Sequence, residues 1–301
     1  MEYILEICNL EKRYGKFNAI SKLNMKIPKG AIYGLIGKNG AGKTTLIRIV
    51  CGLQKPTLGK YTIYGVSNEN KKIIKSRKRL GAIIETPSIC LDMTAEENIK
   101  EQYKLLGLPN YEGIEELLKL VELDKTGKKT AKHFSLGMRQ RLGIAIALAG
   151  NPDILILDEP INGLDPEGII EIRELIIKLN KERGITFLIS SHYLDELAKI
   201  ATCYGIIDKG KMIREISSSE LENSFKKKVQ INVNDIKECV KYLEEEKIAY
   251  KVISDEIIDI YERINVSDLV IALSKKNCIV NSFKEKDETL ENYFLNLVGG
   301  A

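Results

Sequence analysis

The hydrophobic pattern along this chain alternates between short apolar runs and longer segments with apolar residues at helical spacing. Three short, mostly apolar runs predict buried strands of a parallel sheet: residues 31–36, 154–157 and 185–191. Helices are predicted over residues 44–50, 136–150, 167–183 and 193–201. Strands that alternate with helices in this order predict an α/β core.

Residues 1–36 and 88–150 depart from that alternation in opposite ways. The first stretch consists of strand-like runs separated by tight polar turns, so we expect a small β-subdomain there. The second stretch is helical: residues 94–97 form a capping box, and residues 111–123 are amphipathic at helical spacing. A helical subdomain over about 88–150 follows from this pattern.

Beyond about residue 220, the hydrophobic pattern predicts a smaller unit of short strands and helices. Strands are predicted over residues 229–233, 257–261 and 278–284, and helices over residues 236–247, 267–275 and 290–298. We therefore divide the chain into a first domain, residues 1–220, and a small α+β domain, residues 221–301. The small domain carries no recognisable chemical motif, which favours a stabilising or dimer-supporting role over that of a ligand sensor.

A glycine-rich segment follows the first buried run. Residues 37–44 read Gly-Lys-Asn-Gly-Ala-Gly-Lys-Thr and fit the G-x-x-x-x-G-K-[ST] pattern of a phosphate-binding loop. Lys43 suits the β and γ phosphates of a nucleotide, and the Thr44 hydroxyl suits Mg²⁺. A strand before and a helix after disfavour the alternative, a glycine turn that binds nothing. The residues expected to hold the nucleotide are Gly37, Asn39, Gly40, Gly42, Lys43, Thr44 and Thr45.

Two acids, Asp158 and Glu159, end the apolar run at 154–157. The carboxyl ends of strands are where open α/β sheets place their chemistry. We expect Asp158 to hold Mg²⁺ and Glu159 to act as the general base on the attacking water. The alternative interpretation is that both acids are simply solvated at the end of a strand. The phosphate loop elsewhere in the chain makes this interpretation the weaker one.

Residues 134–141, Phe-Ser-Leu-Gly-Met-Arg-Gln-Arg, precede the acid run. Ser135 is a good N-cap for the helix that follows, and a helix N-terminus suits a phosphate. The segment resembles the signature motif of ATP-binding cassette (ABC) ATPases, from which Leu136 and Met138 depart while Ser135 and Gly137 remain. An ordinary capped core helix is the alternative for this segment alone.

The resemblance covers residues 1 to about 220 and implies a fold: a P-loop ABC-type nucleotide-binding domain with a RecA-like core, an antiparallel β-subdomain and a helical subdomain. It also implies roles for three further residues. Tyr14 stands where the family has an aromatic ring that stacks on adenine, and Asp165 lies in the loop that couples the two sites of a dimer. His192 matches the histidine that contacts the γ-phosphate, whereas His133 has no such context and is expected at the surface.

Glu85 stands where the family usually has a glutamine that reaches Mg²⁺ and the attacking water. A carboxylate keeps the metal-binding oxygen and adds a negative charge. This variant, together with the Ser-Leu-Gly-Met sequence, resembles the subgroup that exports lantibiotics and bacitracin-like peptides. The alternative is a private drift from Gln to Glu in another exporter.

Composition narrows the remaining classes. The chain has 301 residues, 29% of them charged, and a net charge of +4, which is too mild to indicate nucleic-acid binding. The basic segment 71–79 is expected to be a solvated helix face, with anionic lipid as the less favoured partner. The six cysteines show no C-x-x-C spacing and are expected to be reduced, mostly buried thiols. No stretch approaches the ~20 apolar residues needed to span a bilayer, and the N-terminus lacks a basic signal-peptide start.

The resemblance therefore implies an ATP-hydrolysing subunit of an ABC exporter that uses ATP and Mg²⁺. Its expected partners are an integral membrane permease, which handles the peptide cargo, and a second copy of the chain, packed head to tail with ATP between the phosphate loop of one copy and Ser135 and Gly137 of the other. We expect it in the cytoplasm at the inner face of the cell membrane. The alternatives are an exporter of another drug or lipid, a soluble ABC protein acting on ribosomes or DNA, and a GTPase, which the missing Asn-Lys-x-Asp motif disfavours.

Overall fold

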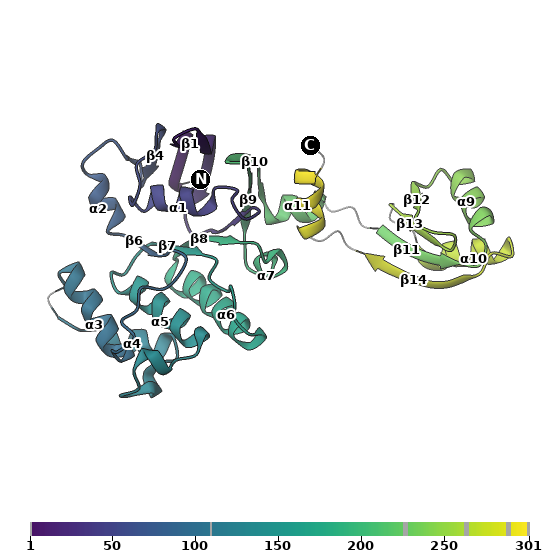
Figure 1. The fold of residues 1–301 in the computed structure, drawn as a ribbon. Helices are drawn as coiled ribbons and strands as arrows, with labels where there is room; N and C mark the ends of the chain where they lie inside the picture. Colours follow the sequence, from purple (N-terminus) through teal and green to yellow (C-terminus); the bar gives the residue numbers. More distant parts are fainter. Residues whose placement is uncertain (1, 109, 225–227, 262–264, 287–289, 300–301) are drawn as a thin grey trace. The chain divides into compact units, whose positions relative to one another are not determined.

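The computed structural model of the chain describes residues 2–108, 110–224, 228–261, 265–286 and 290–299. The chain divides into two compact units, Met1–Ser218 and Ser219–Ala301. Figure 1 shows the path of the chain through both units.

A six-stranded sheet with the order β10-β9-β3-β8-β7-β6 forms the centre of the first unit. Its strands are β3 (Ile32–Ile36), β6 (Leu80–Ile83), β7 (Ile154–Asp158), β8 (Thr186–Ser191), β9 (Cys203–Asp208) and β10 (Lys211–Ser217). All neighbours are parallel except β9 and β10. Every residue of β3, β7 and β8 is buried, as expected for parallel strands covered on both faces.

The register of this sheet determines where the loops that follow its strands begin. Ile36 at the end of β3 lies beside Ser191 at the end of β8, and Asp158 at the end of β7 lies beside Ser190. The three segments that follow these strands therefore start at the same edge of the sheet.

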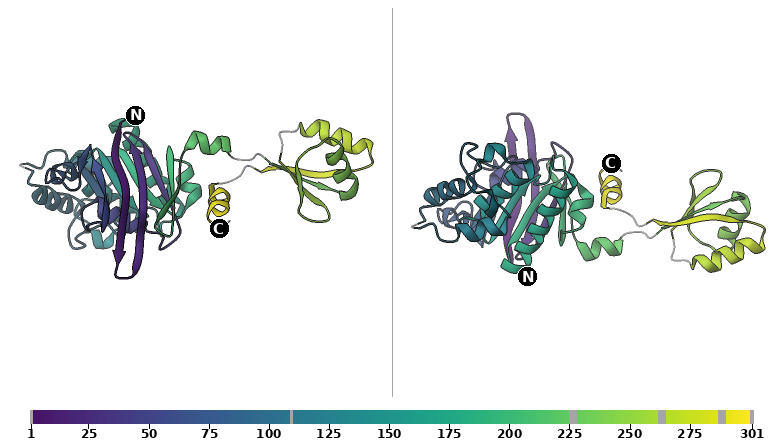
Figure 2. Two further views of the ribbon diagram at one scale, coloured as in Figure 1. Left: turned by 90° about the horizontal axis from the view of Figure 1, so that it is seen from above. Right: turned by 90° about the horizontal axis from the view of Figure 1, so that it is seen from below.

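A second sheet, antiparallel and of the order β2-β1-β4-β5, forms the predicted β-subdomain. It consists of β1 (Tyr3–Tyr14), β2 (Phe17–Pro28), β4 (Leu58–Ile63) and β5 (Val66–Ser67). The long β1–β2 hairpin is drawn in purple in Figure 2. Its buried side chains share one core with helix α1 (Lys43–Val50) and with β3 and β7.

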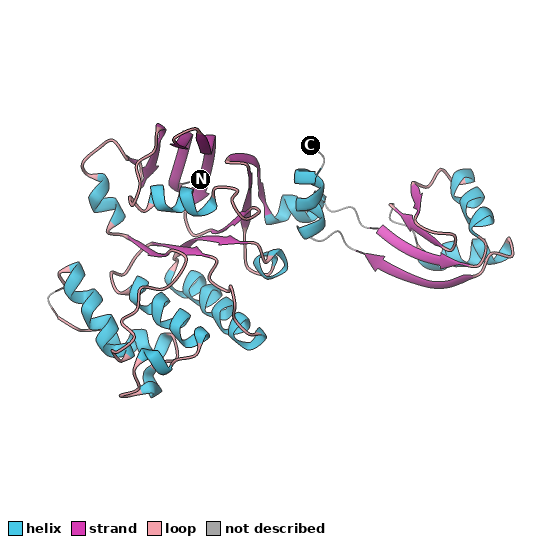
Figure 3. Ribbon diagram, viewed as in Figure 1, coloured by secondary structure: helices cyan, strands magenta, loops and turns pink. Residues whose placement is uncertain are grey.

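The helical subdomain lies on the other side of the central sheet from α1 (Figure 3). The remaining helices of this unit are α2 (Ile73–Arg77), α3 (Ala95–Leu106), α4 (Ile114–Leu120), α5 (Leu136–Leu148), α6 (Pro166–Arg183) and α7 (Leu194–Ala198), with short 3-10 turns at Asp124–Thr126 and Ala131–His133. The predicted capping box is present at the start of α3, where the Thr94 side chain accepts from the Glu97 N–H and the Glu97 carboxylate accepts from the Thr94 N–H.

Several element bounds differ from the expectations, and two differences have a clear physical reason. The helix expected over residues 111–123 is shorter, because α4 begins after Gly113, which has a left-handed backbone. Strand β6 was not expected, since four residues that include Gly81 and Ala82 carry little strand signal. Gly81 is required there because a Cβ would lie 2.3 Å from the Ala147 carbonyl oxygen of α5.

The second unit begins with helix α8 (Ser218–Ser224), ends with α11 (Leu290–Gly299), and has a β-α-β-β-α-β order between them. Its elements are β11 (Lys228–Val233), α9 (Ile236–Glu245), β12 (Tyr250–Val252), β13 (Ile257–Ile260), α10 (Val266–Lys275) and β14 (Val280–Lys286). The sheet order β12-β13-β11-β14 is that of a ferredoxin-like split βαβ motif. Strand β12 was not expected from the sequence, since it has only three residues.

Buried apolar residues of α9, α10, β11 and β13 form the core of the second unit, among them Ile231, Leu243, Ile260 and Leu273. Because α9 and α10 contribute to the same cluster, they cover the same face of the sheet. This core contains only residues of the second unit, just as the cluster around α1 contains only residues of the first.

The cysteines are less buried than expected. Only Cys239 and Cys278 are buried, Cys51 and Cys203 are half-buried, and Cys8 and Cys90 are exposed. Burial raises the pKa of the Cys51 thiol to about 12, so this thiol, which follows α1, stays protonated and is no nucleophile. Among the described residues, no helix is both long and apolar enough to cross a membrane.

Because the two units have separate cores, we expect that the free energy of unfolding of the second unit can be lowered without loss of nucleotide binding. Leu273 is fully buried in α10, so Leu273→Ala should lower the stability of this unit by about 2–5 kcal/mol. Hydrogen exchange of β11 and β13 in the full chain measures that loss, while ATP affinity should stay unchanged. Ile271→Ala is the matched control, because Ile271 lies on the same helix and is 55% exposed. Loss of ATP binding in Leu273→Ala would show that the two units do not fold independently.

Candidate active site

The phosphate loop, residues 37–45, connects β3 to α1 at the edge where β3, β7 and β8 end. Gly42 precedes α1 with φ +108°, and a Cβ there would lie 2.7 Å from the Ala19 carbonyl oxygen. Gly40 also has positive φ, +80°, but open space around it. The N-cap residue Gly42 has no side chain to bond the first N–H groups of α1, so these groups are available to an anion.

Lys43 is the buried cation of this edge. Its ammonium donates to the Gly37 carbonyl oxygen at 2.6 Å and lies 3.3 Å from Glu159 Oε1. It therefore connects the phosphate loop to the acid at the end of β7.

Asp158 is only 2% exposed and is held by hydroxyl groups. Thr44 Oγ1 donates to its Oδ2 at 2.8 Å, and Ser190 Oγ donates to its Oδ1. In the described part of the chain, no basic side chain pairs with this carboxylate. A buried carboxylate usually has a cationic partner, and a carboxylate beside a hydroxyl is a donor set that fits Mg²⁺.

Glu159 adopts φ +52°, a conformation that is uncommon for a residue with a side chain. Its N–H donates to the carbonyl oxygen and the hydroxyl of Ser190, both at 3.1 Å. Its Oε2 lies 2.7 Å from His192 Nδ1 and accepts from the His192 N–H at 3.3 Å. The backbone thus aims the Glu159 carboxylate between Lys43 and His192.

Ser135, Gly137 and Asp165 form a second group. Ser135 caps α5 by accepting from the Met138 N–H at 3.2 Å, and Asp165 caps α6 by accepting from the Gly168 N–H at 3.1 Å. A Cβ on Gly137 would lie 4.0 Å from both Leu164 and Gly168, so the two helix starts are neighbours. Within the described ranges, no hydrogen bond or ion pair joins these three residues to Lys43, Asp158 or Glu159.

A cavity of about 290 Å³ opens at the phosphate loop. It is lined by Tyr14, Phe17, Ala19, residues 38–45 and Glu159. Tyr14 therefore lies at the nucleotide end of the site, where its hydroxyl donates to Gln54 Oε1 and the Lys12 ammonium lies 5.1 Å from its ring centre. Phe17, Gln54 and Ser190 carry no motif of their own, so their place at this site was not predicted from the sequence.

Glu85 forms an ion pair with Arg48 of α1, whose guanidinium donates to Glu85 Oε1 at 2.8 Å. The Glu85 carboxylate is mostly exposed, and its backbone has φ +62°. Arg48, the last basic residue of the phosphate-loop helix, was not expected to take part in the site.

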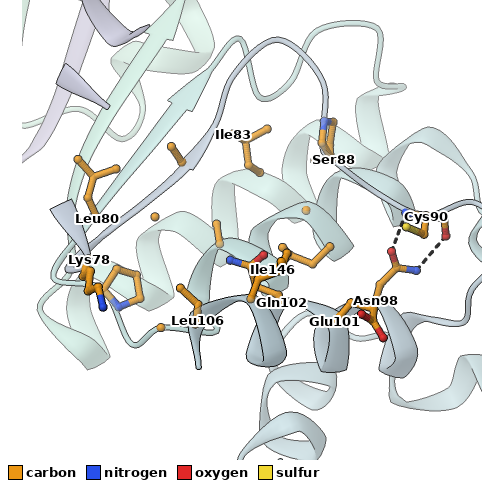
Figure 4. A pocket seen from close by; sticks show the side chains of 18 residues that line it. Lys78, Leu80, Ile83, Ser88, Cys90, Asn98, Glu101, Gln102, Leu106 and Ile146 are labelled. Carbon is orange, nitrogen blue, oxygen red and sulfur yellow. Dashed lines mark hydrogen bonds between the residues drawn. The ribbon is translucent and has the colours of Figure 1, made fainter. Parts of the chain in front are cut away.

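A second cavity of about 290 Å³ lies between β6 and the helices α3 and α5 (Figure 4). It is lined by β6, by Pro87, Ser88 and Cys90, and by the facing sides of α3 and α5. Asn98 of α3 fixes one wall, since it accepts from the Cys90 N–H at 2.8 Å and donates to the Cys90 carbonyl oxygen at 3.1 Å. We call this cavity the α3–α5 groove.

Comparison with known proteins places this site in a family. The family model described as ABC transporter matches residues 20–162. The chain is 40% identical to the bacitracin transport ATP-binding protein BcrA of Enterococcus faecalis, over 100% of this chain and 98% of the relative. It is 44% identical to the lantibiotic transport ATP-binding protein SrtF of Streptococcus pyogenes, over 73% of this chain and 93% of the relative.

A solved structure agrees with these matches. The dimeric post-hydrolysis state of the ATP-binding cassette MJ0796 bound to ADP and Pi superimposes with a TM-score of 0.64 at 26% identity, covering 71% of this chain and 98% of that chain. The chain therefore belongs to the ABC transporter family of ATP-binding proteins. It binds nucleotide and is the ATP-hydrolysing subunit of a transporter, so the predicted family, the P-loop ABC fold and the ATPase activity are confirmed.

The two loop glycines give a matched test of the phosphate loop. Gly40→Ala should weaken ATP binding about tenfold, because a left-handed backbone costs a side-chain residue about 1–2 kcal/mol. Gly42→Ala should weaken binding more, because it adds a clash with the backbone of Ala19. Equilibrium binding of ATP measures both variants, and thermal unfolding checks their fold. Equal losses in the two variants would contradict the close approach of Gly42 to Ala19.

Proposed function

We propose that this chain powers the export of bacitracin-like or lantibiotic peptides through a separate membrane permease and so protects the cell from them. The observation that carries this proposal is similarity over the whole chain, the second unit included, to bacitracin transport proteins of two organisms: BcrA of Enterococcus faecalis and, at 41% identity over 100% of this chain, BcrA of Bacillus licheniformis. Glu85, where most of the family has glutamine, supports the same subgroup.

The phosphate-loop cluster supplies the hydrolytic chemistry in this proposal. Backbone N–H groups at Gly37, Asn39, Gly40, Gly42 and Thr45 cradle the phosphates, and Lys43 neutralises the β and γ groups. Thr44 and Asp158 hold Mg²⁺, which when bound offsets the charge that develops on the phosphate oxygens. Tyr14 receives the adenine ring.

Glu159 then acts on the attacking water. With triphosphate bound, the Lys43 ammonium turns from Glu159 to the phosphates, which leaves the Glu159 carboxylate as a proton acceptor. His192 stays close to that carboxylate and contacts the γ-phosphate. Water oxygen attacks the γ-phosphorus, its proton passes to Glu159, and the bond to the ADP oxygen breaks.

A second copy of the chain completes the site. Ser135, Gly137 and Asp165 sit on two neighbouring helix starts that carry partial positive charge. In the part of the chain that the structure describes, no hydrogen bond or ion pair links them to the phosphate loop of their own chain. We therefore assign Ser135 and Gly137 to the γ-phosphate held by the partner copy, and Asp165 to the loop that couples the two sites. ATP stabilises the closed dimer, and hydrolysis releases it, which is how the free energy reaches the permease.

The permease is proposed to dock in the α3–α5 groove, with the subunit at the inner face of the cell membrane. The groove has apolar walls from β6 and α5 and a charged rim that includes Lys78 and Glu101. A short amphipathic segment fits such a surface. Glu85 lies between two residues of its wall, Ile83 and Pro87, so an occupant of the groove would contact residues on both sides of this carboxylate.

Glu85 is proposed to leave Arg48 and reach the metal side of the site during the cycle. An exposed ion pair is worth only about 0–1 kcal/mol, so releasing Glu85 from Arg48 would cost little free energy, and the free carboxylate could then help to hold Mg²⁺. The weak Arg48–Glu85 pair thus leaves Glu85 free to respond to an occupant of the α3–α5 groove and to reach the nucleotide site.

Glu159→Gln tests the chemistry and the dimer together. Glutamine keeps the size of the side chain but accepts no proton, so the variant should bind ATP, lose turnover by at least about a hundredfold and accumulate as closed dimers. Light scattering with ATP and Mg²⁺ measures the dimer, and phosphate release measures turnover. Normal turnover by Glu159→Gln would remove Glu159 from the role of base.

Glu85 variants test the link to transport. Cells with Glu85→Ala should be less protected from bacitracin than cells with Glu85→Gln, because the glutamine amide keeps a metal-binding oxygen. In Glu85→Ala, ATP hydrolysis by the purified complex should fall less than the protection of the cells does. Glu116→Ala is the matched control, since Glu116 also forms an exposed ion pair with an arginine, Arg183. Protection by Glu85→Ala that equals the wild type would contradict this role, and a wild type that protects against no peptide would instead favour another exporter cargo.

A further inference from the structure

Phe17 is an exposed aromatic residue that none of the family motifs explains. Its side chain is 63% exposed, yet it lines the same cavity as the phosphate loop. A single exposed apolar side chain is ordinary, but one at the wall of a ligand cavity is a surface that a ligand can cover.

The hairpin geometry brings Phe17 and Tyr14 together. Tyr14 ends β1, Phe17 begins β2, and the two are register partners across a turn of two residues, Gly15 and Lys16. Directly opposed residues of an antiparallel pair project from the same face, with Cβ atoms about 4.5–5.5 Å apart. Both rings therefore stand at the same end of the cavity, beyond the residues that hold the phosphates.

Tyr14 is already engaged with neighbouring side chains. Its hydroxyl donates to Gln54, and the Lys12 ammonium lies over its ring at 5.1 Å. Lys12 in turn donates to the Lys55 carbonyl oxygen at 2.8 Å, so its position is fixed. One face of the Tyr14 ring is therefore taken, which leaves less of this ring for a nucleoside than an isolated aromatic would offer.

We propose that Phe17 is a second contact for the base and ribose of ATP, so that Tyr14 and Phe17 together form the nucleoside-binding surface. This assignment rests on the proposed role of the phosphate-loop cavity and extends it to a residue outside the motifs. The Phe17 ring has no polar atom, so it contributes affinity by apolar contact and stacking without reading the edge of the base. ATP and GTP should depend on it alike.

The test compares ATP with inorganic tripolyphosphate, which has the phosphates but no nucleoside. In the full chain with Mg²⁺, Phe17→Ala should raise the Kd for ATP about tenfold and leave the Kd for tripolyphosphate unchanged. Phe17→Tyr should bind ATP as the wild type does. Leu58→Ala is the matched control, because Leu58 is an exposed apolar residue of the same subdomain that does not line the cavity.

Two outcomes overturn the assignment. Unchanged ATP affinity in Phe17→Ala shows that the ring makes no contact with the nucleoside. Equal losses for ATP and tripolyphosphate show that Phe17 supports the loop and not the ligand. Failure of the wild type to bind ATP is a separate result, which refutes the function of the cavity and not the choice of Phe17.

Discussion

The parallel register of β3, β8 and β7 is the constraint on which the site depends. It places Ile36, Ser191 and Asp158 at one edge, so the phosphate loop, His192 and the acid pair all start from neighbouring strand ends. Two carboxylates and one ammonium are then buried or half-buried within a few ångströms of each other. Such a group is stable only when each charge has a partner, and a triphosphate with its metal supplies partners for both signs.

The same edge also shows what one chain lacks. The helix starts at Ser135 and Asp165 are capped and adjacent, and in the described ranges they make no hydrogen bond or ion pair to the phosphate loop of their own chain. The helix starts carry partial positive charge, and the phosphate loop binds an anion in a cavity that is open on one side. The two surfaces are therefore complementary. Two copies related by a rotation would satisfy both, which is the physical reason for our proposal that ATP lies between them.

The spacing of the motifs and the periodicity of apolar residues predicted most of the fold, because buried parallel strands and capped helices have strong local sequence signals. The strand ends at Ile36 and Asp158 followed from the apolar runs, and the caps at Thr94 and Ser135 followed from residue type. Contacts between side chains distant in sequence were beyond such reasoning. Arg48 and Glu85 pair across 37 residues, and Ser190 supports Asp158 across 32, with no periodicity to indicate either. Phe17 was missed because an aromatic residue at the start of a strand is ordinary until the cavity beside it is known.

The central claim is that each hydrolytic site is shared between two copies, and mixing two inactive variants tests it most directly. Lys43→Ala removes the phosphate-loop charge, and Gly137→Asp puts a negative charge at the helix start, where the nearest atoms to a new Cβ lie 4.0 Å away. Each variant alone should hydrolyse no ATP, whereas their mixture should regain hydrolysis, because one site of the mixed dimer has an intact loop facing an intact Gly137. A mixture that stays as inactive as its components would contradict a shared site.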